Sequence, residues 1–234
     1  MSDHPIIFSP SMVRALVAGR KTQTRRGLYT VRSAKDGMIP ATATMMAPYY
    51  PDRMLSVADG MDKYVTLSGW QRRKKGDRLW VRENVKAIER EEDGVDCVRY
   101  EADAAIIPIQ NTEKASNQWV DLYHYRKKRS APVPSIHMPR WASRLTLNLT
   151  ATKIERVQAI TVPDAVAEGI RLGRFGWTFF DTDHPNNAWD TPKGAFEMLW
   201  KYVNGYESWG RNPWVVAMTF TVAERNIDEK EQAA

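Results

Sequence analysis

Two long segments in which apolar residues occupy every second position constrain the fold most. In residues 144–157 these are Leu145, Leu147 and Leu149. Residues 213–222 repeat the pattern with Trp214, Val216, Met218, Phe220 and Val222. A period of two is typical of a strand with one buried face. The pattern therefore predicts two long strands of a β-sheet.

Three short segments carry helix signals: residues 10–18, 161–170 and 191–205. Gly19 fits the left-handed position that follows the end of the first helix. Thr161 and Thr191 precede the other two helices and can cap them. The apolar face predicted for the last helix consists of Phe196, Leu199, Trp200 and Val203.

Further strands are predicted at "TQTRR", directly after Gly19 and Lys21, and at residues 97–103. A turn at Gly76-Asp77 precedes one more strand, to which we assign Leu79, Val81 and Val85. Three segments without this regularity are predicted to be long insertions: residues 27–70, which look irregular and suit a lid, residues 104–134 and residues 171–190.

The chain has 234 residues, a length that suits one domain. Strands separated by short helices, with pairings between distant segments, indicate an α+β domain built on a small barrel. We expect this domain to span residues 1–225 and the acidic residues 226–234 to form a flexible tail.

The net charge of +6 is concentrated in clusters. Residues 20–26, 72–78 and 126–129 hold 13 of the 34 basic residues. Such clusters favour a polyanionic partner such as RNA, or they are solvated faces. The residues predicted to contact nucleic acid are Arg20, Arg72, Arg73, Lys74, Lys75, Arg126, Lys127, Lys128 and Arg129.

Cys97 is the single cysteine, so an intramolecular disulfide is excluded and a reducing, cytoplasmic location is expected. The four histidines lack the spacing of metal ligands, and we expect neither a metal nor a cofactor. The start of the chain lacks the features of a signal peptide, and no apolar segment is long enough to span a membrane. Nothing in the sequence indicates the oligomeric state.

Three segments occur in a distinctive order. "AGRKTQTRR" follows the first helix, "KKGDRLWVRE" comes next, and "PDAVAEGI" precedes the last helix and strand. This order resembles the ASCH domain family of the PUA-like superfamily, including its prophage-type members, over residues 6–26, 74–103 and 137–223. The resemblance implies a PUA-like small β-barrel (ASCH) with flanking helices, a cleft beside the first helix, and recognition of RNA or a modified nucleoside.

One branch of this family, the small N4-acetylcytidine amidohydrolases, is catalytic. Its pattern is a Lys and a Thr three residues apart after the first helix, with a Glu in a later helix. Lys21, Thr24 and Glu168 stand at these positions. The resemblance thus implies a metal-independent hydrolase that acts on an amide of a modified pyrimidine nucleoside, although this chain is more than twice as long as those enzymes.

The chemistry of these three residues is consistent with that role. A Thr hydroxyl becomes a nucleophile when a base removes its proton, and a Lys can be that base if desolvation lowers its pKa. Glu168 would hold Lys21 or donate a proton to the leaving amine, although a nearby carboxylate also raises a Lys pKa. Residues three apart in an extended segment point to opposite faces, so Lys21 and Thr24 need a turn to converge.

Other residues have two readings each. Arg25 and Arg26 bind a phosphate or carboxylate of the ligand, or one of them pairs with Glu83. His137 and Trp141 line the cleft, where Trp141 stacks on a base, or they pack at the start of a strand. Because neither Lys21 nor Glu168 belongs to the expected apolar core, we expect their replacement to leave folding almost unchanged.

Two further functions fit the sequence. One is a non-catalytic module that binds RNA through its basic residues, and the other is a ribonuclease. The high isoelectric point and the separated basic clusters favour a polymer, whereas the Lys–Thr–Glu set favours chemistry on a small ligand.

Overall fold

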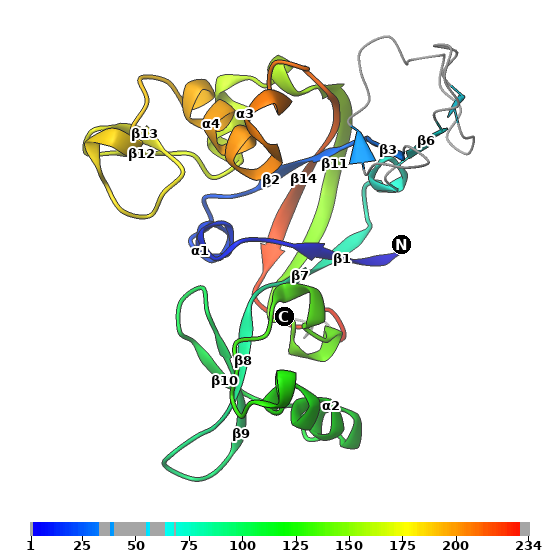
Figure 1. Cartoon of the computed structure of the whole chain (residues 1–234), viewed down its shortest axis with the longest axis vertical. Coiled ribbons are helices and arrows are strands. Elements are labelled where there is room, and N and C mark those ends of the chain that lie inside the picture. Colours follow the sequence, from blue (N-terminus) through cyan, green and yellow to red (C-terminus); the bar gives the residue numbers. More distant parts are fainter. Residues whose placement is uncertain (1, 33–37, 40–54, 57–63, 68, 230–234) are drawn as a thin grey trace. The chain divides into compact units, whose positions relative to one another are not determined.

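The computed structural model describes residues 2–32, 38–39, 55–56, 64–67 and 69–229 (Figure 1). It is a mixed α+β structure, as predicted, with two compact units. Unit 1 comprises Met1–Gly19, Gly76–Asn148 and Thr221–Ala234, and unit 2 comprises Arg20–Lys75 and Leu149–Phe220. The sheets formed by the described residues are open, and no closed barrel occurs among them.

The largest sheet has the strand order β1-β7-β11-β14-β2. Its strands are β1 (Asp3–Ile7), β7 (Arg78–Arg82), β11 (Thr146–Arg156), β14 (Trp214–Ala223) and β2 (Gln23–Gly27). β1 runs parallel to β7, which pairs antiparallel with the start of β11, and β14 pairs antiparallel with β2. Strands β11 and β14 contribute residues to both units.

The two strands predicted from alternation are confirmed. Leu145, Leu147 and Leu149 are all buried, with at most 2% of their surface exposed. In β14 the first half is covered on both faces, because Val215 and Ala217 are buried as well as Val216.

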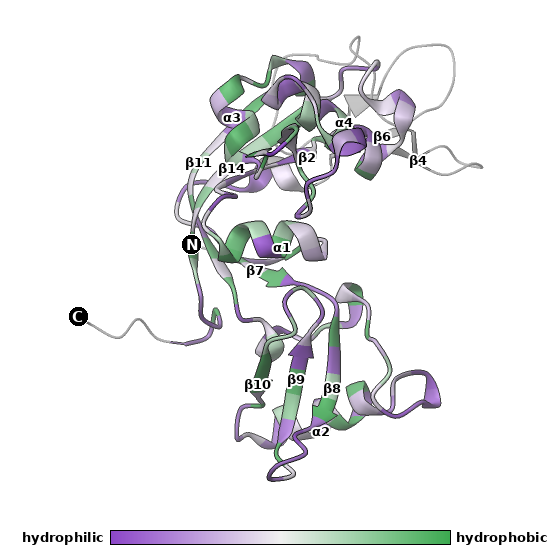
Figure 2. Cartoon of the chain, turned by 90° about the vertical axis from the view of Figure 1, so that its left-hand side faces the viewer, coloured by the Kyte–Doolittle hydropathy of each residue, from purple (hydrophilic) through white to green (hydrophobic). Residues whose placement is uncertain are grey.

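A three-stranded sheet in unit 1 has the order β10-β9-β8. It consists of β8 (Val85–Glu89), β9 (Asp96–Tyr100) and β10 (Ile106–Pro108), and helix α2 (Glu113–Tyr123) packs against it (Figures 1 and 2). The apolar residues on both elements form a core that includes Val85, Val98 and Trp119. The indole of Trp119 also donates to the carbonyl of Cys97 at 2.9 Å.

One prediction for unit 1 was wrong, and the insertion predicted at 104–134 has regular structure that was not predicted. Val85 begins a new strand rather than continuing that of Leu79 and Val81, because β7 ends at Arg82 and Glu83 and Asn84 belong to no strand. Residues 104–134 contain a helix, α2, whose cap is Thr112: its hydroxyl accepts from the amide of Ala115 at 3.2 Å.

Unit 1 also contains α1 (Pro10–Val17), which confirms the first predicted helix, and 3₁₀ turns at Tyr125–Lys127, Ser135–His137 and Arg140–Ala142. The chain end is better anchored than expected. The side-chain amide of Asn226 donates to the carbonyls of Arg140, Trp141 and Ser143, so the predicted flexible tail does not begin at residue 226. Residues 230–234 lie outside the described part.

Unit 2 contains the other two predicted helices, α3 (Val162–Ala167) and α4 (Pro192–Asn204), and the hairpin β12 (Arg171–Gly173) with β13 (Gly176–Thr178). Its 3₁₀ turns are Trp70–Arg72, Val157–Ala159, Pro185–Asn187 and Tyr206–Ser208.

The segment 27–70 was predicted to be irregular, but its described part forms strands. They are β3 (Tyr29–Arg32), β4 (Met38–Ile39), β5 (Leu55–Ser56) and β6 (Tyr64–Leu67), in the order β4-β3-β6-β5. The remainder of that prediction lies outside the described residues.

The cap of α4 gives a test of the fold. The hydroxyl of Thr191 accepts from the amide of Gly194 at 3.0 Å. We expect Thr191→Ala to lower the free energy of unfolding by about 1 kcal/mol, since it leaves that amide without its cap. Urea denaturation measures this change, and Thr191→Ser, which keeps the hydroxyl, should unfold like the wild type. Equal stability of the Ala and Ser variants would contradict the capping contact.

Candidate active site

The segment after Gly19 pairs with the end of α3. Gly19 adopts a positive φ of 68°, and the chain then runs extended into β2. Lys21 and Glu168 form an isolated antiparallel bridge, and the amide of Thr22 donates to the carbonyl of Ala167 at 2.8 Å. The hydroxyl of Thr161 caps α3 at the amide of Asp164, which fixes the other end of this short helix.

The Lys21 side chain is completely buried against Glu168. Its Nζ donates to Glu168 Oε2 at 2.7 Å and to the Glu168 carbonyl at 2.8 Å. Burial lowers the pKa of Lys21, Glu168 opposes this shift, and the positive charges of Arg26 and Arg25 add to it. Since both partners are buried, the reason for expecting their replacement to leave folding unchanged no longer holds.

Arg25 contacts three carboxylates. Its guanidinium donates to Glu155 Oε1 at 2.7 and 3.1 Å and to Glu168 Oε1 at 3.1 Å, and it lies 3.2 Å from Asp164 Oδ2. The two oxygens of Glu168 are therefore divided between Arg25 and Lys21. We call these five residues, Lys21, Arg25, Glu155, Asp164 and Glu168, the Lys21 cluster.

Gln23 completes one face of β2. Its side chain accepts from Arg25 and donates to Asp164 Oδ1 at 3.2 Å. Lys21, Gln23 and Arg25 thus direct their side chains to the same acidic residues, as the two-residue period of an extended chain requires.

Thr24 is not part of this network. Alternation directs it to the opposite face of β2 from Gln23 and Arg25. Its side chain is buried, opposite Met218 in the strand register, and no described residue forms a hydrogen bond with its hydroxyl. The structure therefore brings together Lys21 and Glu168, and no turn brings Thr24 to them.

Arg26 lies over the indole of Trp70, with 5.8 Å from Cζ to the ring centroid. Its positive charge adds to the lowering of the Lys21 pKa, and burial lowers its own pKa while the carboxylate of Glu168 opposes that shift. The predicted pairing of Arg25 or Arg26 with Glu83 is wrong, because the carboxylate of Glu83 accepts from Arg144 at 2.8 and 2.9 Å.

Charges of both signs meet around Glu168. The carboxylates are those of Glu155, Asp164 and Glu168, and the cations are Lys21, Arg25, Arg26 and Lys153. A guanidinium does not lose its proton in proteins, and Lys153 is mostly exposed. Lys21 is therefore the cation of this group that combines burial with a proton it can lose.

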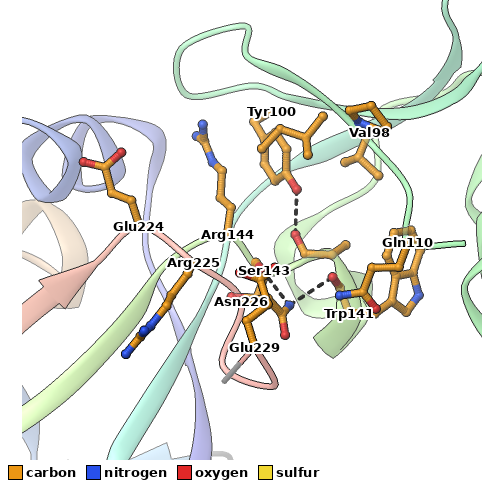
Figure 3. A pocket seen from close by; sticks show the side chains of 13 residues that line it. Val98, Tyr100, Gln110, Trp141, Ser143, Arg144, Glu224, Arg225, Asn226 and Glu229 are labelled. Carbon is orange, nitrogen blue, oxygen red and sulfur yellow. Dashed lines mark hydrogen bonds between the residues drawn. The ribbon is translucent and has the colours of Figure 1, made fainter. Parts of the chain in front are cut away.

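His137 and Trp141 belong to unit 1, whereas Lys21, Thr24 and Glu168 belong to unit 2. The ring of His137 lies 5.4 Å from that of Tyr125. Trp141 borders a pocket of about 180 Å³ (Figure 3). Polar groups around this pocket contact one another: the Tyr100 hydroxyl donates to the carbonyl of Ala142, and the Asn226 amide to that of Ser143 (Figure 3).

The predicted nucleic-acid contacts differ in exposure. Arg20 donates to the carbonyl of Gly169 at 3.4 Å and lies 3.8 Å from Asp181. Arg73 lies over Trp70 at 5.7 Å. Arg126 lies over Tyr125 at 5.4 Å. The exposed members of the set are Arg72, Lys74, Lys75, Arg126, Lys127, Lys128 and Arg129.

No family model matches the chain, and neither a curated protein nor a solved structure is significantly similar to it. In the part of the chain that the structure describes, no three or more His, Cys, Asp or Glu side chains are arranged to hold a metal ion. None of the described helices is long and apolar enough to cross a membrane.

Sequence reasoning missed Gln23, Glu155 and Asp164 as members of the site. For Glu155 a signal was present, because it shares the alternation register of Leu145, Leu147 and Leu149. A carboxylate at a position of the buried face requires a cationic partner.

Titration should report the state of Lys21. The unfolded chain holds the Lys21 proton up to the ordinary pKa of 10.5, whereas the folded chain releases it at lower pH. Between these two values the unfolded state binds more protons, so the free energy of unfolding should rise with pH. We expect this rise in the wild type and its loss in Lys21→Met, measured by urea denaturation at a series of pH values. Lys193→Met, at an exposed position, should behave like the wild type. An identical pH dependence in Lys21→Met would show that the Lys21 pKa is not lowered.

Proposed function

We propose that the chain is a hydrolase acting on an amide of a modified pyrimidine nucleoside, of the N4-acetylcytidine kind, with Lys21 as its acid–base group and Glu168 as the residue that holds Lys21. The proposal rests on one observation: a completely buried lysine bonded to a glutamate. Perturbed, buried titratable groups are concentrated at functional sites. The resemblance of "GRKTQTRR" and "PDAVAEGI" to the ASCH amidohydrolases points to the same two residues.

Lys21 has the properties of a general base. Burial and the charges of Arg25 and Arg26 favour its neutral amine. The carboxylate of Glu168 raises the Lys21 pKa, but this effect is reduced because Arg25 also bonds to that carboxylate. In the proposed reaction the amine takes a proton from the attacking nucleophile as the nucleophile adds to the amide carbonyl. Lys21 then gives this proton to the nitrogen of the cytosine when the C–N bond breaks.

Glu168 holds Lys21 in place during this cycle. Its carboxylate and its carbonyl both accept from Nζ, so they stabilise the ammonium formed between the two steps. Because Nζ is completely buried, the proposal includes a movement of neighbouring side chains when the substrate enters.

The nucleophile in this proposal is a water molecule. The resemblance assigns the nucleophile to Thr24, but the alternation of β2 directs that hydroxyl away from Lys21. Hydrolysis with water as nucleophile releases acetate and cytidine without an acyl-enzyme intermediate. The finer assignment of the fold, a PUA-like barrel, and a cytoplasmic location belong to the same proposal and rest on the resemblance and on the single cysteine.

Acetate release from N4-acetylcytidine tests this function. We expect turnover by the wild type and a loss of about a hundredfold or more in Lys21→Met and Glu168→Gln, because the first removes the acid–base group and the second removes the carboxylate that holds it. Thr24→Val should retain most of the activity. Glu207→Gln, on an exposed side chain, is the matched control for Glu168→Gln.

Folding must be followed in parallel, since breaking a buried pair also destabilises the protein. Circular dichroism at the assay temperature shows whether each variant is folded. No acetate release by the wild type would refute the function. Activity lost in Thr24→Val as in Lys21→Met would instead favour Thr24 as the nucleophile.

RNA binding is a second candidate function, favoured by the basic segment of unit 1. Arg126, Lys127, Lys128 and Arg129 are consecutive and exposed, and Lys127, Lys128 and Arg129 form no ion pair with a described residue. Arg126 and Lys127 also have positive φ angles of 54° and 58°, a costly conformation for residues other than glycine. Exposed cations held in such a turn suit contacts with phosphates.

Salt dependence tests this second function. If these cations contact RNA phosphates, affinity should fall steeply with salt, and Lys127→Gln with Lys128→Gln should lower the affinity and flatten the slope. Fluorescence anisotropy of a labelled RNA at several salt concentrations measures both. Lys114→Gln with Lys193→Gln changes the net charge equally at exposed positions and should have less effect. Equal behaviour of the two double variants would show that the segment is only a solvated face.

A further inference from the structure

The pocket beside Trp141 lies within unit 1 and is not used by the proposed reaction (Figure 3). It has a volume of about 180 Å³, and every residue that lines it belongs to this unit. Val98 and Tyr100 of β9 and Ile107 and Pro108 of β10 give it apolar walls. Because a cavity of about 150 Å³ holds one benzene ring, this pocket has room for a single ring with a short substituent.

The end of the chain forms a further wall of this pocket. Four of its residues line the pocket: Glu224, Arg225, Asn226 and Glu229. The side-chain amide of Asn226 donates to three backbone carbonyls, at 2.7, 3.0 and 3.0 Å. The carboxylate of Asp228 accepts from the guanidinium of Arg140 at 2.6 Å. These bonds hold the chain end in place, so the pocket is formed before a ligand arrives.

Three polar groups of the pocket already have partners within the fold. The Tyr100 hydroxyl donates to a backbone carbonyl at 2.7 Å, and the Ser143 hydroxyl donates to another at 2.9 Å. The guanidinium of Arg144 donates to Glu83 at 2.8 Å and to Asp103 at 2.9 Å. These three groups fix the walls of the pocket and leave its selectivity to other side chains.

Three further side chains that line the pocket form no hydrogen bond or ion pair with a described residue: Gln110, Glu224 and Glu229. All three are exposed. The carboxylates of Glu224 and Glu229 can only accept hydrogen bonds. Since a carboxylate repels an anion and attracts a cation, these two residues favour a ligand with a positive charge.

Trp141 gives a second reason to expect a cation. Its indole borders the pocket, and no cation among the described residues lies over its ring. By contrast, the guanidinium of Arg144 already lies over the ring of Tyr100, 4.1 Å from the centroid. A cation is attracted to the face of an aromatic ring, most strongly to that of an indole. Apolar walls and an indole next to unpaired carboxylates thus match an amine carried on a ring.

We propose that this pocket binds a small organic cation, an amine carried on a single aromatic ring. In this arrangement the ring lies against the apolar side chains of β9 and β10 and the indole of Trp141, and the ammonium group faces Glu224 and Glu229. Gln110 offers its side-chain carbonyl as a further acceptor. The site is independent of the proposed hydrolase, because Lys21 and Glu168 belong to unit 2.

Three ligands of similar size and different charge test the proposal: benzylamine, benzyl alcohol and benzoate. NMR titration of the full chain measures their binding. We expect benzylamine to bind at least about fivefold more tightly than benzyl alcohol, the scale of one exposed charge contact, and benzoate to bind most weakly. The advantage of benzylamine should shrink at high salt. Equal affinity of benzylamine and benzyl alcohol, or tighter binding of benzoate, would overturn the proposal.

The indole N–H signals show where the ligand binds. The chain has nine Trp, and the signal of Trp141 is the one that disappears in Trp141→Phe. Benzylamine should shift this signal saturably. The signal of Trp214, assigned in the same way with Trp214→Phe, should not move, because Trp214 belongs to unit 2 and does not line the pocket. A Trp141 signal that stays in place up to saturating benzylamine would refute the site.

Substitution of the carboxylates tests their role. Glu224→Gln with Glu229→Gln should remove most of the preference for benzylamine over benzyl alcohol. Both side chains are exposed, so this double variant keeps the test open even if Trp141→Phe does not fold. Glu91→Gln with Glu92→Gln is the matched control, since it changes the net charge equally at exposed positions of unit 1. A preference that survives in the first double variant, or that both double variants lose equally, would contradict the proposal.

Discussion

The buried contact between Lys21 and Glu168 is the interaction on which the candidate site depends. Removing two charges from water costs several kcal/mol for each ion, so such a pair persists only with good geometry and further hydrogen bonds. Here Nζ reaches both the carboxylate and the carbonyl of Glu168, and Arg25 satisfies the second carboxylate oxygen. The contact joins the segment before β2 to the end of α3, and it places a buried amine near the positive charges of Arg25 and Arg26.

Strand β2 organises the surroundings of this pair through its two faces. Gln23 and Arg25 extend from one face toward Glu155, Asp164 and Glu168. The other face carries Thr24 and Arg26, the latter over Trp70. The eight residues "GRKTQTRR" therefore direct Lys21 and Arg25 to the acidic residues and Arg26 to an aromatic ring, and this separation follows from the period of an extended chain.

Part of the site could be predicted and part could not. The resemblance to the ASCH amidohydrolases matches Lys21 and Glu168 to one pattern and so predicts that they lie together. In the structure Lys21 Nζ lies 2.7 Å from Glu168 Oε2. The partners of Arg25 were not predicted, since they come from distant segments. Glu155 in β11 lies 130 residues further along the chain, and Glu168, directly after α3, lies 143 residues further. The pairing of Glu83 was predicted wrongly for the same reason: many cations were available, and sequence does not rank them by distance.

The sequence by itself determined the local elements of this protein: the alternating strands β11 and β14, and the capped helices α3 and α4, whose signals lie within a few neighbouring residues. It also contained the signal of α2, in Thr112 followed by Ala115, Trp119 and Leu122, which share one helix face. Only the tertiary structure decided that Lys21 is buried, that Thr24 faces away from it and that two arginines share Trp70. Burial and electrostatic environment arise from contacts between distant segments, and no local periodicity encodes them.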